Sequence, residues 1–240
     1  VTVLPYLAVR YSEVGEDCNL TIESLLDYFQ DCSTFHSEDA GLGVEHFKEK
    51  NQIWMLSAWQ ICVNRYPHLC ERITVGTVPY EFKWFVGCRN FEMKSESGEV
   101  LAYANSIWTL MDVAKMVPAK VDMEDIKGYG IGEKYPMEYA PRKIDIPEGG
   151  QSREPFAVRQ HHLDCNHHVN NGQYVRMAMD FVPEDFQIWQ LRAEYRSQAL
   201  LGDMVYPAVA VSDDGKRYTV SLNQENGKPY CIVELTEKQA

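Results

Sequence analysis

The stretch His161-His162-Leu163-Asp164-Cys165-Asn166-His167-His168-Val169-Asn170-Asn171 is the densest group of polar side chains in the sequence. It leads directly into a helical pattern from Asn170 to Phe181, in which Tyr174, Met177 and Phe181 share the face expected to be buried. A helix begins with unpaired N–H groups and the positive end of its dipole. The stretch therefore predicts a polar site in front of a helix, and the order of elements around it predicts the fold.

Downstream of this helix the pattern changes to strands. From Ile188 to Gln198, apolar and polar residues alternate, which predicts a half-buried antiparallel strand with one polar face. Three further short strands are predicted at 204–211, 216–224 and 229–235, with turn signals at Asp213-Asp214-Gly215 and Asn226-Gly227 between them.

The first half of the chain has the same order of elements. The stretch 19–40 predicts a helix, capped by Asn19 or Thr21 and ended by Gly41 and Gly43. The apolar residues that fit one face of this helix are Ile22, Leu25, Leu26, Phe29, Cys32 and Phe35. Three β-rich stretches follow at 52–65, 74–91 and 100–112; their tryptophans, Trp54, Trp59, Trp84 and Trp108, are predicted to lie mainly in the core.

Between the halves lies a segment rich in proline, glycine and mixed charge. We place the first half at 1–117, a linker at 118–153 and the second half at 154–240. Repetition of strand, helix and strands predicts two copies of one α+β unit. Val9-Arg10 and Asp17-Cys18-Asn19 also echo Val158-Arg159 and Asp164-Cys165-Asn166, although the spacing of the two echoes differs.

Composition excludes several classes of function. A formal net charge of −12 disfavours a protein that grips nucleic acid or an anionic membrane. The seven cysteines are scattered and contain no C-x-x-C pair, which favours free thiols in a reducing compartment. No apolar run reaches the ~18 residues that span a bilayer. We therefore expect a cytoplasmic protein without stable membrane insertion.

The polar stretch holds the groups that acyl transfer to water requires. A carboxylate, an amide and an imidazole, from Asp164, Asn166 and His168, precede a helix whose N–H groups can polarise a carbonyl. Metal binding is the sharper alternative, because the histidines and Asp164 offer several ligands. Adjacent histidines usually point to different sides, so we expect neither a metal nor another cofactor.

A resemblance to a known family sharpens this prediction. The run Leu163-Asp164-x-Asn166-x-His168-Val169-Asn170-Asn171, followed by Tyr174, resembles the signature of the acyl-[acyl carrier protein] thioesterases of the plant FatA/FatB type and their bacterial relatives. The first half carries it too, at 25–43, at Arg65-Tyr66-Pro67 and at Ala104-x-Ser106-x-Trp108. The resemblance implies an α+β tandem (double) hot-dog fold, with two antiparallel sheets each wrapped around a long helix.

The resemblance also implies a reaction and its residues. We expect hydrolysis of fatty acyl-[acyl carrier protein], with Asp164, Asn166 and His168 catalytic and the first half shaping the acyl pocket. Gln198, Val169 and Asn170 are expected to support them. Where the plant family has Glu-Tyr-Arg-x-Glu-Cys, this chain has Glu194-Tyr195-Arg196-Ser197-Gln198-Ala199, so a cysteine nucleophile is not expected. Attack by a water molecule that His168 or Asp164 activates is the expected mechanism.

Alternatives remain open at this point. The substrate could be acyl-coenzyme A, the reaction could be a dehydration, or the chain could be an acyl-binding module without catalysis. An acidic carrier protein would need a basic patch, for which the linker and the residues just before it offer Lys115, Lys120, Lys127, Lys134, Arg142 and Lys143. Both a monomer and a homodimer fit two fused halves.

Overall fold

The computed structural model describes residues 2–238 of the chain, and side chains from residue 7 onward. The chain forms two compact units. The first comprises Val1–Ser57 and Ile61–Ala140, and the second comprises Ala58–Gln60 and Pro141–Ala240. No helix in the described residues is both long and apolar enough to cross a bilayer.

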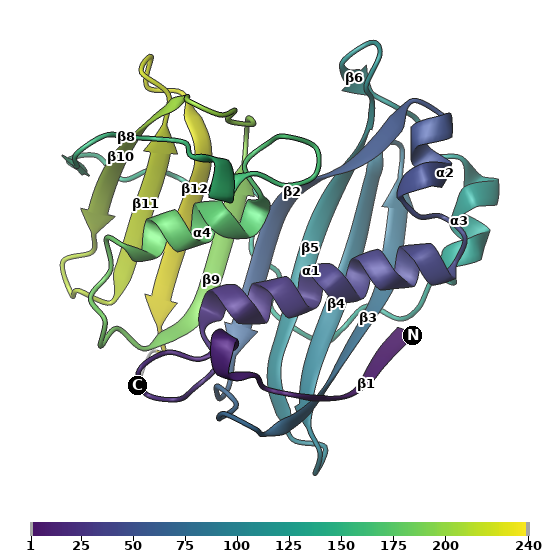
Figure 1. The fold of residues 1–240 in the computed structure, drawn as a ribbon, viewed down its shortest axis with the longest axis horizontal. Coiled ribbons are helices and arrows are strands. Elements are labelled where there is room, and N and C mark those ends of the chain that lie inside the picture. The colour runs from purple at the N-terminus through teal and green to yellow at the C-terminus, as the bar shows by residue number, and fades with distance from the viewer. Residues whose placement is uncertain (1, 239–240) are drawn as a thin grey trace. The chain divides into compact units, whose positions relative to one another are not determined.

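The first unit is an antiparallel sheet with a long helix on one face (Figure 1). Its strands run in the order β1-β3-β4-β5-β2, and β6 pairs with β5. Their bounds are β1 Thr2–Ala8, β2 Gln52–Val63, β3 Arg72–Lys83, β4 Val86–Ser95, β5 Val100–Asp112 and β6 Val117–Pro118. The helices are η1 Tyr11–Glu13, α1 Ile22–Asp39, α2 Val44–Glu49 and α3 Met123–Tyr129.

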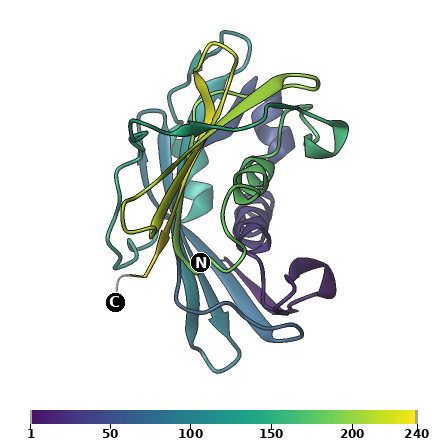
Figure 2. The ribbon, with the colours of Figure 1, turned by 90° about the vertical axis from the view of Figure 1, so that its left-hand side faces the viewer.

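The second unit repeats this plan with a shorter helix. Its strands run in the order β9-β12-β11-β10-β7, and β8 pairs with β10. Their bounds are β7 Gln151–Ser152, β8 Phe156–Ala157, β9 Ile188–Tyr195, β10 Met204–Val211, β11 Arg217–Asn223 and β12 Pro229–Glu237. Its helices are η2 Gln160–His162 and α4 Asn171–Met179. In each unit the main helix packs on one face of the sheet (Figure 2), and the predicted α+β tandem hot-dog fold is confirmed.

Helix α1 follows from its sequence with one correction. Thr21 Oγ1 accepts the Ser24 N–H at 3.2 Å, and Gly41, with φ +70°, ends the helix as predicted. Leu25, Leu26 and Phe29 are fully buried, but the Phe35 side chain is 49% exposed. The buried stripe continues from Cys32 to Ser33 and His36, because those positions lie one turn apart on the same face.

The predicted strand 74–91 is two strands, β3 and β4. They form a hairpin in which Lys83 pairs with Val86 across Trp84 and Phe85. Trp84 takes the left-handed conformation, with φ 58°, and its side chain is 71% exposed. The prediction that Trp84 lies in the core was wrong, because neither turn residue belongs to the types that usually mark a hairpin turn. Trp59, by contrast, is buried.

The segment between the units is anchored on the first unit by Asn90. This buried side chain accepts the Tyr135 N–H and the Tyr139 O–H through Oδ1, each at 3.0 Å. Its Nδ2 donates to the Ala104 carbonyl at 3.1 Å. The segment also holds helix α3, so residues 118–153 are more ordered than a plain linker.

The same segment covers the polar face of β9. Arg192 Nη2 donates to the Pro141 carbonyl at 2.6 Å, and Glu194 Oε2 accepts the Ile144 N–H at 2.8 Å. Only 5% of Glu194 is exposed. The alternation along β9 was therefore predicted correctly, but its polar face binds another part of the chain instead of water.

Candidate active site

The predicted catalytic residues lie on a tight loop that closes in front of α4. Leu163 and Val169 form a β-bridge at its base. Inside it, the Asp164 N–H donates to the His168 carbonyl at 2.8 Å and the His167 N–H donates to the Asp164 carbonyl at 3.1 Å. His167 takes a left-handed conformation, with φ 62°. This is the geometry of a turn followed by a left-handed residue.

The Asp164 carboxylate holds this loop together. Its Oδ1 accepts the Asn166 N–H at 2.8 Å and the His168 N–H at 3.2 Å. The carboxylate thus touches the backbone of both other predicted catalytic residues. This arrangement leaves Oδ2 as the oxygen of Asp164 that can meet a substrate or water.

His168 is the half-buried imidazole of the loop. Its Nδ1 is buried and has no hydrogen-bond partner among residues 2–238. The opposite ring nitrogen, Nε2, is therefore the one that can reach a water molecule or a substrate. The imidazoles of His161 and His167, like the Cys165 thiol, are exposed.

The supporting residues Val169 and Asn170 connect the loop to its surroundings. Val169 is buried, and its N–H donates to the Ala199 carbonyl at 3.1 Å. Asn170 caps α4, because its Oδ1 accepts the Gly172 N–H at 2.8 Å. This cap, together with the bond from the Gln173 N–H to the Asn170 carbonyl, occupies two of the helix N–H groups predicted to polarise a substrate. The first N–H group of the helix, that of Asn171, is not one of these two.

Gln198 lies outside β9, which ends at Tyr195. Its side chain is exposed in the loop toward β10, so it is not on the polar face of the strand as predicted. The next residue, Ala199, is buried, and its N–H donates to the Tyr174 Oη at 2.9 Å. Tyr174 and Ala199 thereby join α4 to the loop that supports Val169. The sequence pattern gives Tyr174 as a buried helix residue, but it contains no signal for this hydrogen bond.

His162 supports the loop from the other side. Its Nδ1 accepts the Arg159 N–H at 3.0 Å, and its carbonyl accepts the Asn170 N–H at 2.9 Å. Burial lowers the pKa of the His162 ring, and the neighbouring His161 and Arg159 lower it further. Among residues 2–238, no three His, Cys, Asp or Glu side chains lie close enough to hold a metal ion together.

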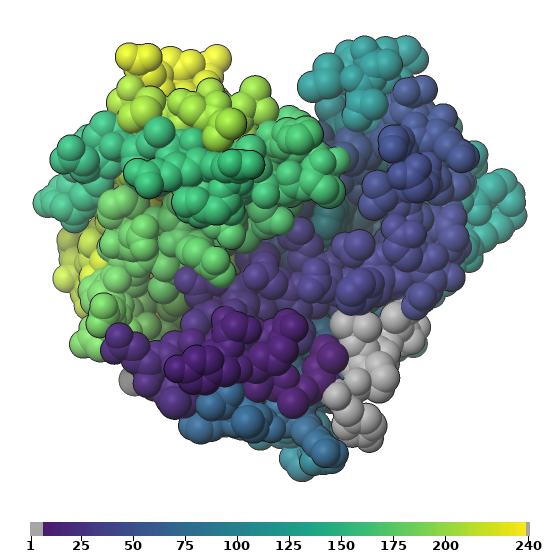
Figure 3. Space-filling model, in the orientation of Figure 1, coloured from purple at the N-terminus to yellow at the C-terminus, as the bar shows by residue number. Residues whose placement is uncertain are grey.

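The first unit contains a loop with the same backbone hydrogen bonds but without the predicted catalytic side chains. Val14 pairs with Leu20, the Gly15 N–H donates to the Asn19 carbonyl, and Cys18 has φ 61°. Gly15 thus corresponds to Asp164 and Asn19 to His168. The spacing that relates Val9 to Val158 applies throughout, so the echo of Asp17-Cys18-Asn19 in Asp164-Cys165-Asn166 is displaced by two positions. Figure 3 shows the segment before α1 as purple atoms at the surface of this unit.

Comparison with known proteins gives the class of this fold and site. Residues 6–129 match the model of the acyl-ACP thioesterase N-terminal domain, and residues 147–234 match that of the C-terminal domain. Two chloroplastic acyl-[acyl-carrier-protein] hydrolases of Cuphea viscosissima, FATB3 and FATB1, are 30% and 27% identical over 94% and 92% of this chain. The chain spans 60% and 58% of their lengths.

Solved structures share the fold at lower identity. An acyl-ACP thioesterase from Bacteroides thetaiotaomicron superimposes with a TM-score of 0.89 at 21% identity, and covers 98% of this chain and 96% of its own. The 12:0-ACP thioesterase from Umbellularia californica gives 0.85 at 20% identity, with the same coverage. This chain belongs to the acyl-ACP thioesterase family.

Proposed function

We propose that this chain hydrolyses the thioester between a fatty acyl group and acyl carrier protein. A water molecule attacks the carbonyl carbon, the carbon–sulfur bond breaks, and free fatty acid and the carrier thiol are released. Support comes from the family match along both units and from the names of the plant relatives, which are acyl-[acyl-carrier-protein] hydrolases.

The observation that carries the proposal is the loop from Asp164 to His168. The Asp164 carboxylate accepts the backbone N–H groups of Asn166 and His168, and this supports a site built from these three residues directly before α4. We assign His168 Nε2 as the base that takes a proton from the attacking water. Asn166 orients the thioester, and Asp164 holds the loop through Oδ1.

This assignment needs neither a cysteine nor a glutamate at positions 198 and 199. The exposed Gln198 can donate a hydrogen bond to substrate or water, but an amide does not take a proton at neutral pH. Cys165 is exposed and acts in no step. The chemistry requires only side chains and backbone of the chain itself.

A cytoplasmic location is part of the same proposal. All seven cysteines, each within the described residues, are free thiols. Free thiols fit a reducing compartment. The plant relatives are chloroplastic.

The test measures thiol release from dodecanoyl and palmitoyl thioesters, the acyl groups that relatives of this chain name. Each is offered on acyl carrier protein and on coenzyme A, to wild type and to His168→Ala. We expect the carrier-protein thioesters to be hydrolysed and kcat to fall by at least ~10²-fold in the variant, since general base catalysis contributes roughly that much.

Other outcomes separate the alternatives. Release from coenzyme A alone would change the substrate, and formation of an enoyl product from a 3-hydroxyacyl thioester without thiol release would identify a dehydratase. Acyl binding without release of any product would identify a binding module. Near-normal turnover in His168→Ala would remove this residue from the mechanism.

A further inference from the structure

A turn on the second unit presents large apolar side chains to solvent. It runs from Leu200 to Met204, between β9 and β10, and we call it the Leu200 turn (Figure 1). Leu200 is 49% exposed, Leu201 is 61% exposed and Met204 is 40% exposed. Three such residues within five positions form a patch, whereas single exposed apolar residues are ordinary.

The fold does not need leucines at these positions, because the first unit builds the same turn with others. The Leu200 N–H donates to Asp203 Oδ2 at 2.8 Å, and the His68 N–H donates to Glu71 Oε2 at 3.0 Å. The Asp203 N–H donates to the Leu200 carbonyl, as the Glu71 N–H does to that of His68. The third residue is left-handed in both, Gly202 with φ 85° and Cys70 with φ 67°. The exposed His68 therefore occupies the position of Leu200.

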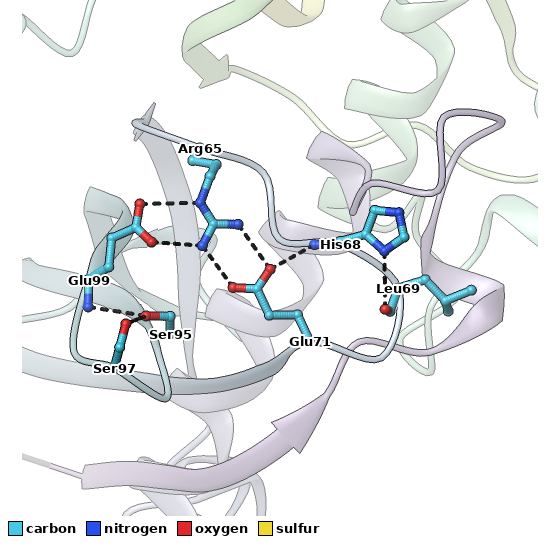
Figure 4. A network of polar contacts seen from close by, with 7 residues as sticks. All are labelled: Arg65, His68, Leu69, Glu71, Ser95, Ser97 and Glu99. Atoms are coloured by element: carbon cyan, nitrogen blue, oxygen red, sulfur yellow. Dashed lines mark hydrogen bonds and ion pairs between the residues drawn. The ribbon is translucent and has the colours of Figure 1, made fainter.

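The two turns differ in what covers them. In the first unit, Arg65 donates to both carboxylate oxygens of Glu71, at 2.8 and 2.9 Å, and to Glu99 (Figure 4). In the second unit Ser197 occupies the position of Arg65. The Arg65 N–H donates to the Leu101 carbonyl on the neighbouring strand, and the Ser197 N–H donates in the same way to the Tyr230 carbonyl. Ser197 donates to the Pro229 carbonyl instead. In the second unit the Tyr230 hydroxyl, in place of a guanidinium, donates to Asp203 Oδ2 at 3.4 Å, and the half-buried Asp203 carboxylate lies in the same turn as the exposed Leu200, Leu201 and Met204.

The turn lies beside the candidate active site and beside a cation. The Ala199 carbonyl, directly before it, accepts the N–H of Val169, which follows His168. The Gly202 N–H donates to the Val158 carbonyl at 3.0 Å, and the side chain of the next residue, Arg159, is exposed. An apolar patch bordered by an exposed arginine suits a partner that has an apolar spot among acidic side chains.

The linker lysines that the sequence offers for this purpose are largely engaged elsewhere. Lys115 pairs with Asp112, Lys127 with Glu124 and Lys143 with Asp145. Lys134 stacks on the Tyr139 ring, with Nζ 3.7 Å from the ring centroid. With a chain charge of −12, an acidic partner is repelled overall, so a local cation such as Arg159 decides where it can approach.

We propose that the Leu200 turn and Arg159 form the docking surface for acyl carrier protein. The leucines cover an apolar spot of the carrier and Arg159 meets its acidic side chains, which brings the thioester to the His168 loop. The proposal rests on the proposed function for the identity of the partner.

The experiment compares Leu200→Ser/Leu201→Ser with Val211→Ser. Val211 is 48% exposed at the opposite end of β10, about 23 Å along the strand from Met204, and serves as the matched control. For the double variant we expect KM for palmitoyl-acyl carrier protein to rise at least about tenfold with kcat unchanged. KM for palmitoyl-coenzyme A, which lacks the carrier, should stay as in wild type, and Val211→Ser should alter neither. Thermal melting verifies that each variant is folded.

Arg159→Glu gives a second, independent arm. We expect it to raise KM for the carrier thioester at low salt, with the difference from wild type shrinking as salt is added. Unchanged carrier KM in both the double variant and Arg159→Glu overturns the docking surface. So does a double variant that only converts a dimer to a monomer in sedimentation, which would make the turn an interface between two copies.

Direct binding separates this proposal from the proposed function. Fluorescence anisotropy with labelled palmitoyl-acyl carrier protein measures docking without turnover. Binding by wild type that the double variant loses, without hydrolysis by either, supports the docking surface while the hydrolase proposal fails. Absence of carrier binding by wild type overturns the docking surface whatever the activity.

Discussion

At the scale of single residues, the two oxygens of the Asp164 carboxylate differ in their contacts. One oxygen accepts two backbone N–H groups of the loop, and the other faces away from these bonds. An amide supplies the same acceptor as a carboxylate, but it carries no charge and is no base. Asparagine at this position therefore separates loop holding from proton transfer.

We expect Asp164→Asn to keep kcat within about tenfold of wild type, and Asp164→Ala to lose at least ~10²-fold. In the alanine variant the N–H groups of Asn166 and His168 lose their acceptor, so the loop opens. Steady-state kinetics with the best carrier thioester measures both. An equal loss in the two variants would instead assign Asp164 as the catalytic base.

His36 is a second residue whose position is informative. It is buried in the first unit, and its Nδ1 accepts a hydrogen bond from Arg89 Nη1 at 2.7 Å. Burial and then the positive charge of Arg89 lower the pKa of His36 to about 4, and burial lowers the pKa of Arg89 to about 10. Arg89 also lies over the Tyr129 ring, 5.5 Å from its centroid. A neutral histidine thus accepts from a buried cation.

This pair predicts a pH-dependent stability. Because the pKa of His36 is lower in the folded than in the unfolded chain, unfolding takes up a proton between about pH 6.5 and 4. This contribution to the free energy of unfolding is complete above that window and is lost as the pH falls through it, up to roughly 3 kcal/mol. The free energy of unfolding, measured with urea, should differ less between pH 7 and 4.5 in His36→Gln than in wild type. The glutamine amide can still accept the hydrogen bond from Arg89. If the free energy of unfolding changes equally between pH 7 and 4.5 in wild type and in His36→Gln, His36 is not the source of the pH dependence.

Residue-scale prediction from sequence is easiest where the proposed site is contiguous. Asp164, Asn166 and His168 lie within five positions, so a turn brings them together without any knowledge of the sheets. The bond between the Tyr174 hydroxyl and the Ala199 N–H joins residues 25 positions apart. Such a contact depends on how the helix lies on its sheet, which periodicity alone does not fix.

At the scale of elements, the strands are better predicted than the connections. The β10 range 204–211 was predicted with its observed bounds, because turns flank a run of β-forming residues. The Trp84-Phe85 hairpin was missed because it lacks a turn-forming residue, and α2 was missed because six residues give too little periodicity. The polar face of β9 was identified, but its partner in the segment between the units could not be.

Asn90 gives the prediction that belongs to this scale. Asn90→Ala leaves the half-buried Tyr135 N–H without its acceptor and removes the donor to the Ala104 carbonyl. We expect the free energy of unfolding to drop by roughly 1–3 kcal/mol. Urea denaturation measures it.

Tyr139→Phe is the matched control for that measurement. It removes the hydroxyl that can donate to Asn90 Oδ1 or to the Tyr135 carbonyl, but leaves the bond from the Tyr135 N–H to Asn90 intact. Its loss should therefore be the smaller of the two. A loss as large as that of Asn90→Ala would mean that the Tyr139 hydroxyl, and not the asparagine, holds the segment.

At the scale of the whole molecule, the repeat of elements was visible in the sequence, but its register was not. Residues at equivalent positions of the two units differ, as Gly15 and Asp164 do. Residue identity alone therefore aligned Asp17-Cys18-Asn19 with Asp164-Cys165-Asn166, which is displaced by two positions. Backbone hydrogen bonds supply the register, because they are the same whichever side chain a position carries. The fold class followed from the order of elements, and the docking surface needed the exposures of individual leucines.

The shared loop carries a consequence for how such a chain evolves. In a chain with two copies of one loop, only the copy proposed to be catalytic has to keep its polar side chains, and the other can vary as long as its backbone still closes. The loop with Gly15 and Asn19 then keeps the same backbone, with a glycine at the position of Asp164 and an asparagine at the position of His168. Cys18 in this loop keeps the left-handed conformation. The substitutions Gly15→Asp and Asn19→His are therefore the first to make when the side chains of the second loop are built into the first.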